Sequence, residues 1–115
     1  MDTREKLELA LKEAIRSGDD MRKQNVRMIM SAIKLSEVEK GARLEESEIV
    51  AIIHRELKSR LEARQDAEKA NRADLVQQAD AEIRFIETFL PRQFTEDELD
   101  VLVRETIAEV NASGP

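Results

Sequence analysis

Apolar residues recur every three or four positions along most of the chain, which is the spacing of amphipathic helices. Gly18 and Gly41 are placed to end two of these runs, and Asn71 suits a left-handed turn after a third. Asp19, Asp20 and Asp74 are candidate caps at the starts of the following helices. Together these signals predict an all-α protein, with helices over residues 3–17, 20–40, 46–70 and 75–90.

The predicted second helix, over residues 20–40, is apolar on two nearly opposite sides. Its two arcs are Val26, Ile29, Met30 and Ile33 on one side and Met21, Met28, Ala32 and Leu35 on the other. A helix that is apolar on two sides is expected to be central, packed between neighbours. In the first helix the predicted buried face comprises Leu7, Leu11, Ala14 and Ile15.

The third helix changes character along its length. A stripe of Ile49, Ile52, Ile53 and Leu57 is continued on the same face by Glu56, Arg60 and Arg64. These charges indicate either a solvated arm beyond the core or ion pairs at an interface. The third and fourth helices are predicted to form a long antiparallel hairpin, and the whole an antiparallel helical bundle.

A proline interrupts the helical pattern in "FLPRQFTEDEL", residues 89–99. Pro91 ends the fourth helix, and Thr95 with Glu98 forms a capping box for a fifth. This acidic fifth helix has an apolar face with no later helix in the chain to cover it. That face either docks on the first four helices or is a partner-binding candidate, formed by Leu99, Leu102, Val103 and Ile107.

Composition excludes several classes of protein. The chain has 115 residues, no cysteine, a net charge of -6 and 3% aromatic residues, which disfavours β-sandwiches, disulfide frameworks and broad affinity for nucleic acid or membrane. We find no transmembrane run and no secretory leader, so the expected compartment is the cytoplasm. The first 43 residues carry a charge of +2, so a polyanion would meet that half.

Candidate chemistry is sparse. His54 is the only histidine, and there is no glycine-rich phosphate loop or activated nucleophile, so we expect no cofactor, no metal and no catalytic residue. Lys23, Arg27 and Lys34 form a basic strip within about 40° on the second helix, which predicts a nucleic-acid-binding candidate. Alternatively, these cations keep a central helix soluble by pairing with Glu37 or neighbours.

Four segments resemble the YqeY family in order and spacing: "VRMIMSAIKLSEVEKG", "EIVAIIHRELKSRLEA", "KANRADLVQQADAEI" and "FLPRQFTEDEL". The family is related to the tail domain of GatB, a subunit of the tRNA-dependent amidotransferases, whose tail helps to hold tRNA. The resemblance implies an N-terminal helical domain over residues 1–91 and the first helix of a tail-like domain over residues 92–115. Glu45 stands where the family commonly has a threonine cap.

Three functions are compatible with the sequence. The first is a non-catalytic accessory protein of tRNA-dependent amidotransfer that binds tRNA or the tRNA–amidotransferase complex. The second is a helical adaptor that binds protein, including self-association through the last helix, without binding RNA. The third, a free-standing ligase forming carbon–nitrogen bonds with glutamine as amide donor, lacks a visible nucleophile.

Overall fold

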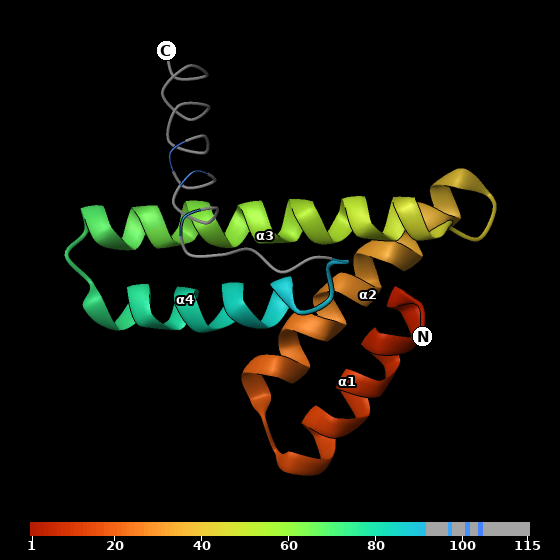
Figure 1. Cartoon of the computed structure of the whole chain (residues 1–115), viewed down its shortest axis with the longest axis horizontal. Coiled ribbons are helices and arrows are strands. Elements are labelled where there is room, and N and C mark those ends of the chain that lie inside the picture. The colour runs from red at the N-terminus through yellow and green to blue at the C-terminus, as the bar shows by residue number, and fades with distance from the viewer. Residues whose placement is uncertain (92–96, 98–100, 102–103, 105–115) are drawn as a thin grey trace. The chain divides into compact units, whose positions relative to one another are not determined.

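The computed structural model describes residues 1–91 and, beyond them, only Asp97, Val101 and Arg104. The described residues form helices and no strand, which confirms the all-α class. The helices are α1 (Thr3–Ser17), α2 (Asp20–Lys40), α3 (Glu46–Lys69) and α4 (Ala73–Glu87) (Figure 1). The chain divides into two compact units, Met1–Glu56 and Leu57–Pro115, and α3 contributes to both.

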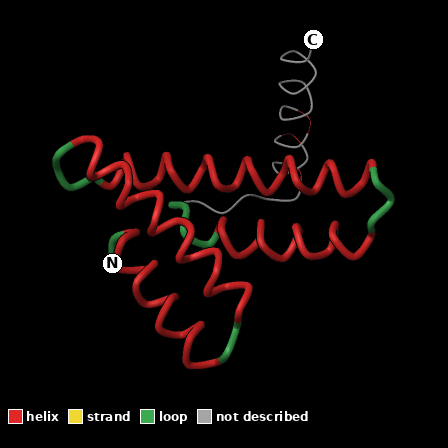
Figure 2. The backbone as a smooth tube through the Cα atoms, turned by 180° about the vertical axis from the view of Figure 1, so that it is seen from behind, coloured by secondary structure: helices red, strands yellow, loops and turns green. Residues whose placement is uncertain are grey.

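The first unit contains α1 and α2, which lie side by side and antiparallel (Figures 1 and 2). Asp19 caps α2 by accepting from the backbone N–H of Arg22, and Gly18 and Gly41 take φ values of 71° and 74° where the two helices end. These stop signals and the bounds of α1 and α2 are as the sequence predicts. A box of Asp2 and Glu5, absent from the prediction, caps α1.

The same unit includes the start of α3, which is tied to the start of α1. The backbone N–H of Thr3 donates to the Glu46 carboxylate at 3.2 Å, and the Thr3 hydroxyl donates to the same group. Thr3 is buried although it is polar, because these hydrogen bonds replace its hydration. The carboxylate that opens α3 therefore also holds the first turn of α1.

Two predictions about buried faces are wrong. Met28 and Leu35, on the second apolar arc of α2, are 48% and 60% exposed, whereas Met21 and Ala32 on the same arc are partly buried, so that arc is not buried as a whole. The arc of Val26, Ile29 and Ile33 is buried as predicted. Ile15, in the last turn of α1, is also exposed rather than buried.

The second unit contains the rest of α3 and, antiparallel to it, α4 (Figure 1). Arg60 of α3 forms an ion pair with Glu82 at 2.6 Å, and Arg64 pairs with Asp80 at 2.5 Å. The predicted hairpin is thus confirmed, and of the two alternatives for these charges the structure shows pairing at an interface. Phe85 of α4 and Phe89, just beyond the end of α4, meet edge to face with ring centroids 5.1 Å apart.

Both ends of α4 differ from the prediction. Asp74 is not the cap: the helix begins at Ala73, and the Asp74 carboxylate instead binds the Arg72 guanidinium just before it. The helix ends at Glu87, three residues before Leu90, where the Thr88 hydroxyl donates to a backbone carbonyl of the last turn. The predicted fifth helix lies outside the described residues, and the predicted domain boundary at 91/92 stays a prediction.

Candidate functional site: a basic-rimmed groove between α1 and α2

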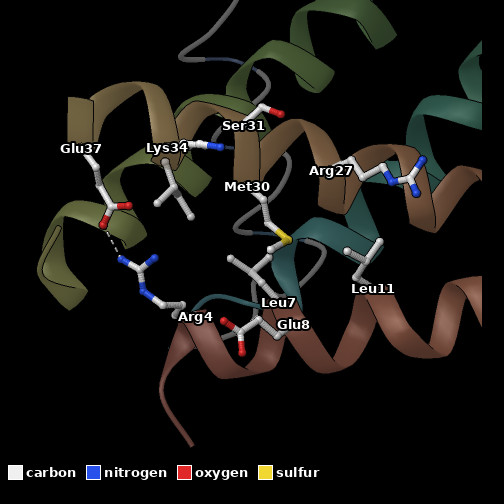
Figure 3. A pocket seen from close by; sticks show the side chains of 10 residues that line it. Arg4, Leu7, Glu8, Leu11, Arg27, Met30, Ser31, Lys34 and Glu37 are labelled. Atoms are coloured by element: carbon white, nitrogen blue, oxygen red, sulfur yellow. Dashed lines mark hydrogen bonds and ion pairs between the residues drawn. The ribbon is translucent and has the colours of Figure 1, made fainter. Parts of the chain in front are cut away.

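The helices α1 and α2 line an open groove with a volume of about 520 Å³ on the surface of the first unit. Its floor is apolar: Leu7 and Ile33 are buried, and the side chains of Leu7 and Met30 point toward one another across it (Figure 3). Its rim is charged. Both helices contribute to the lining, which comprises Arg4, Leu7, Glu8, Leu11, Arg27, Met30, Ser31, Ile33, Lys34 and Glu37.

One end of the groove is held by a charged cluster centred on Glu37. The Glu37 carboxylate accepts from the backbone N–H of Leu44 at 2.9 Å and from the Arg4 guanidinium at 2.7 Å (Figure 3). The Leu44 hydrogen bond, followed by the Arg4 contact, lowers the pKa of Glu37 below its ordinary value. Glu37 is therefore ionised at neutral pH and compensates the charge of Arg4.

The predicted basic strip is only partly brought together. Arg27 and Lys34 both line the groove and are exposed, and neither forms an ion pair within the part of the chain that the structure describes. Lys23 lies away from the groove and pairs with Asp20 at 3.5 Å. The predicted pairing with Glu37 goes instead to Arg4, so Arg27 and Lys34 keep their charges available on the rim.

Sequence reasoning missed the apolar floor of the groove and the hollow that adjoins it. The groove adjoins a second hollow of about 530 Å³, which shares Arg4, Glu8, Lys34 and Glu37 and adds Val38, Ala42 and Arg43. The sequence predicts Leu7 and Leu11, with Ala14 and Ile15, as the buried face of the first helix and gives no sign that Leu11 lines a groove. The signal for a groove was available only in the way α1 and α2 meet, which depends on their packing offset.

In the described residues, no group of three or more histidine and acidic side chains is placed to hold a metal ion, and His54 is exposed on α3. None of the described helices is long and apolar enough to cross a membrane. The candidate face of Leu99, Leu102, Val103 and Ile107 lies outside the described residues, so its role stays a prediction.

Comparison with known proteins identifies one family. Residues 4–115 match the family described as Yqey-like protein. Two yeast relatives are both called altered inheritance of mitochondria protein 41, mitochondrial. The Lachancea thermotolerans protein is 30% identical over all of this chain and 63% of its own length. The Vanderwaltozyma polyspora protein is 31% identical over 70% of this chain and 44% of its own length. The chain thus spans less than two thirds of either relative.

Proposed function

Because the chain belongs to the YqeY family, we propose that it is a non-catalytic accessory protein of tRNA-dependent amidotransfer, which acts by binding tRNA or a complex that contains it. The observation that carries this proposal is the α1–α2 groove, where Arg27 and Lys34 stand exposed without a carboxylate partner among the described residues. Cations placed in this way contact a negatively charged partner without first breaking an internal ion pair.

The link to amidotransfer rests on the relation between the family and the GatB tail. The described residues offer chemistry suited to binding: a groove, a charged rim and an apolar floor. The role proposed here is to hold a substrate or an assembly in place while transamidation occurs on another protein.

Direct tRNA binding is tested by fluorescence anisotropy with labelled total tRNA over a series of salt concentrations. If tRNA contacts the rim, the double variant Arg27→Glu/Lys34→Glu weakens binding and lowers the salt slope by about one unit per lost phosphate contact. The matched control is Lys12→Glu/Arg55→Glu, which makes the same charge change at exposed positions outside the groove. Equal effects of the two double variants would contradict a contact at this rim.

A second candidate function, a helical adaptor that binds protein but not RNA, is favoured by the apolar floor. Phosphate backbones are held by cations and hydrogen-bond donors and gain little from Leu7, Met30 and Ile33. Protein helices bury apolar side chains in such grooves. Size-exclusion chromatography with light scattering over a concentration series tests the version in which the partner is a second copy of this chain.

The proposed compartment is the cytoplasm, supported by the absence of cysteine from the sequence. Both yeast relatives are named as mitochondrial proteins, which makes the mitochondrion the competing location. Subcellular fractionation of cells that express the intact gene distinguishes the two compartments.

A further inference from the structure

We propose that the α1–α2 groove binds an acidic amphipathic helix of a protein partner, with apolar side chains on the floor and carboxylates against Arg27 and Lys34. This inference rests on the proposed function, because it identifies which component of the complex the groove contacts. It follows from three properties of the groove: its apolar floor, the spacing of its cations on α2 and the charge that α1 contributes to the opposite rim.

The floor requires apolar side chains from the occupant. Leu7 and Ile33 form its buried part, while Leu11 and Met30 remain partly exposed. Met30 is unbranched and flexible, which lets it adapt to the shape of an incoming side chain. Covering this partly exposed floor removes apolar surface from water, whereas an exposed phosphate chain lying above it would leave that surface wet.

The spacing of the cations matches a helix. Arg27 and Lys34 are seven residues apart on α2, which is two turns, or about 10 Å along the axis. A helix lying along the groove presents side chains with the same period, so two of its carboxylates, seven residues apart, can meet both cations. Val38 continues the surface one turn beyond Lys34, in the adjoining hollow, and is 72% exposed.

The charge on the rim that α1 forms disfavours a polyanion as the occupant of the groove. Arg4 is compensated by Glu37, which leaves Glu8 as the charge that α1 contributes to the lining without an ion-pair partner among the described residues. A phosphate chain filling the groove would be repelled by Glu8. A protein helix is acidic on one flank alone, so it can meet Arg27 and Lys34 while presenting a neutral or basic residue to Glu8.

The test uses the full chain and three synthetic helical peptides with leucine at positions i, i+3, i+4 and i+7. The peptides differ only in two flanking positions two turns apart, which are both Glu, both Gln or both Lys. Binding is measured by fluorescence anisotropy at neutral pH and low salt. We expect the Glu peptide to bind about tenfold more tightly than the Lys peptide, as two partly exposed charge pairs provide.

Charge reversal of the protein makes the test specific to this groove. Arg27→Glu/Lys34→Glu should invert the preference, so that the Lys peptide becomes the tighter ligand, whereas Lys12→Glu/Arg55→Glu should preserve it. Leu11→Glu, which places a carboxylate on the partly exposed floor, should weaken all three peptides. Circular dichroism confirms that each variant remains helical, and the inversion itself cannot arise from unfolding.

The outcomes separate this proposal from the function on which it rests. Equal binding of the three peptides, or no inversion by Arg27→Glu/Lys34→Glu, overturns the acidic-helix proposal. If labelled tRNA binds and loses affinity with Arg27→Glu/Lys34→Glu while no peptide binds, the acidic-helix proposal fails and the accessory function stands with RNA as the ligand. If neither tRNA nor any peptide binds, both proposals fail.

Discussion

The ion pair between Arg60 and Glu82 should couple α3 to α4 more strongly than a surface pair does. Both side chains are 15% exposed, and the Nε–Oε2 distance is 2.6 Å. The perturbation is a double-mutant cycle with Arg60→Met and Glu82→Gln, which remove one charge each and nearly preserve side-chain volume. The exposed pair Arg72–Asp74, with side chains 56% and 65% exposed, supplies the control cycle.

The expected magnitude follows from the burial of the pair. Two unit charges about 4 Å apart attract by about 4 kcal/mol at an effective dielectric constant of about 20, against about 1 kcal/mol in water. Desolvation of the two side chains offsets part of this attraction. We therefore expect a coupling energy of about 2 kcal/mol for Arg60–Glu82 and a much smaller one for Arg72–Asp74, whose charges are solvated.

The double variant should lower the free energy of unfolding by less than the sum of the two single variants, because each single variant leaves one charge of the pair without its partner. Arg60→Met leaves the mostly buried Glu82 carboxylate without this partner, and Glu82→Gln does the same to Arg60. The free energy of unfolding is measured by urea titration with far-UV circular dichroism, since the chain has neither tryptophan nor tyrosine to report by fluorescence.

Two results would refute this reasoning. A coupling energy for Arg60–Glu82 no larger than that of Arg72–Asp74 would show that burial does not strengthen the pair. A coupling that disappears in moderate salt would show that the charges are screened like surface charges, despite their low exposure.

Four further predictions concern the first unit and are measured by the same urea titration. Ile29→Ala, at a residue 1% exposed, should lower the free energy of unfolding by about 3 kcal/mol, whereas Ile15→Ala, at a residue 53% exposed, should change it by less than about 0.5 kcal/mol; equal effects would contradict the packing of α2. Gly41→Ala should cost about 1 kcal/mol, because an alanine at φ 74° is strained even though nothing lies within 4 Å of the added carbon; no loss would contradict the left-handed stop. Glu45→Thr should add about 1 kcal/mol by completing the capping box whose other half, a hydrogen bond from the Glu45 N–H to Glu48, is already present at 3.0 Å; a loss of stability would count against that geometry. Because the pKa of Glu37 is lower in the folded protein, its stabilising contribution is present above the ordinary value of 4.5 and is lost as the pH falls through the folded pKa; the Glu37→Gln variant should therefore lose less stability than the parent between neutral and acidic pH.

Several local features follow from the sequence alone, because they depend on neighbours in the chain. Gly18 and Gly41 end their helices where the pattern places them, and Asn71 takes a φ of 55° as expected. Glycine and asparagine adopt this conformation at low cost wherever they occur, so tertiary packing need not supply the signal. The same is true of Asp19, whose cap reaches a backbone N–H three residues away.

Other features depend on which surfaces meet, and only the tertiary structure decides them. The apolar arc of Met28 and Leu35 has the same periodicity as the buried arc of α2, but periodicity does not say how many neighbours a helix has. In the same way, Arg4 rather than Lys34 reaches Glu37, because the offset between α1 and α2 brings Arg4 within 2.7 Å of it.

The sequence thus determined the helices of this protein and the side of each that is rich in charge or apolar surface, since both are set by residue spacing along one chain. The tertiary structure decided that Arg60 and Arg64 pair across a hairpin and that Arg27 and Lys34 face a groove with an apolar floor. The physical reason is that ion pairs and grooves form between elements, and their geometry depends on packing offsets of a few ångströms that no spacing within one helix encodes.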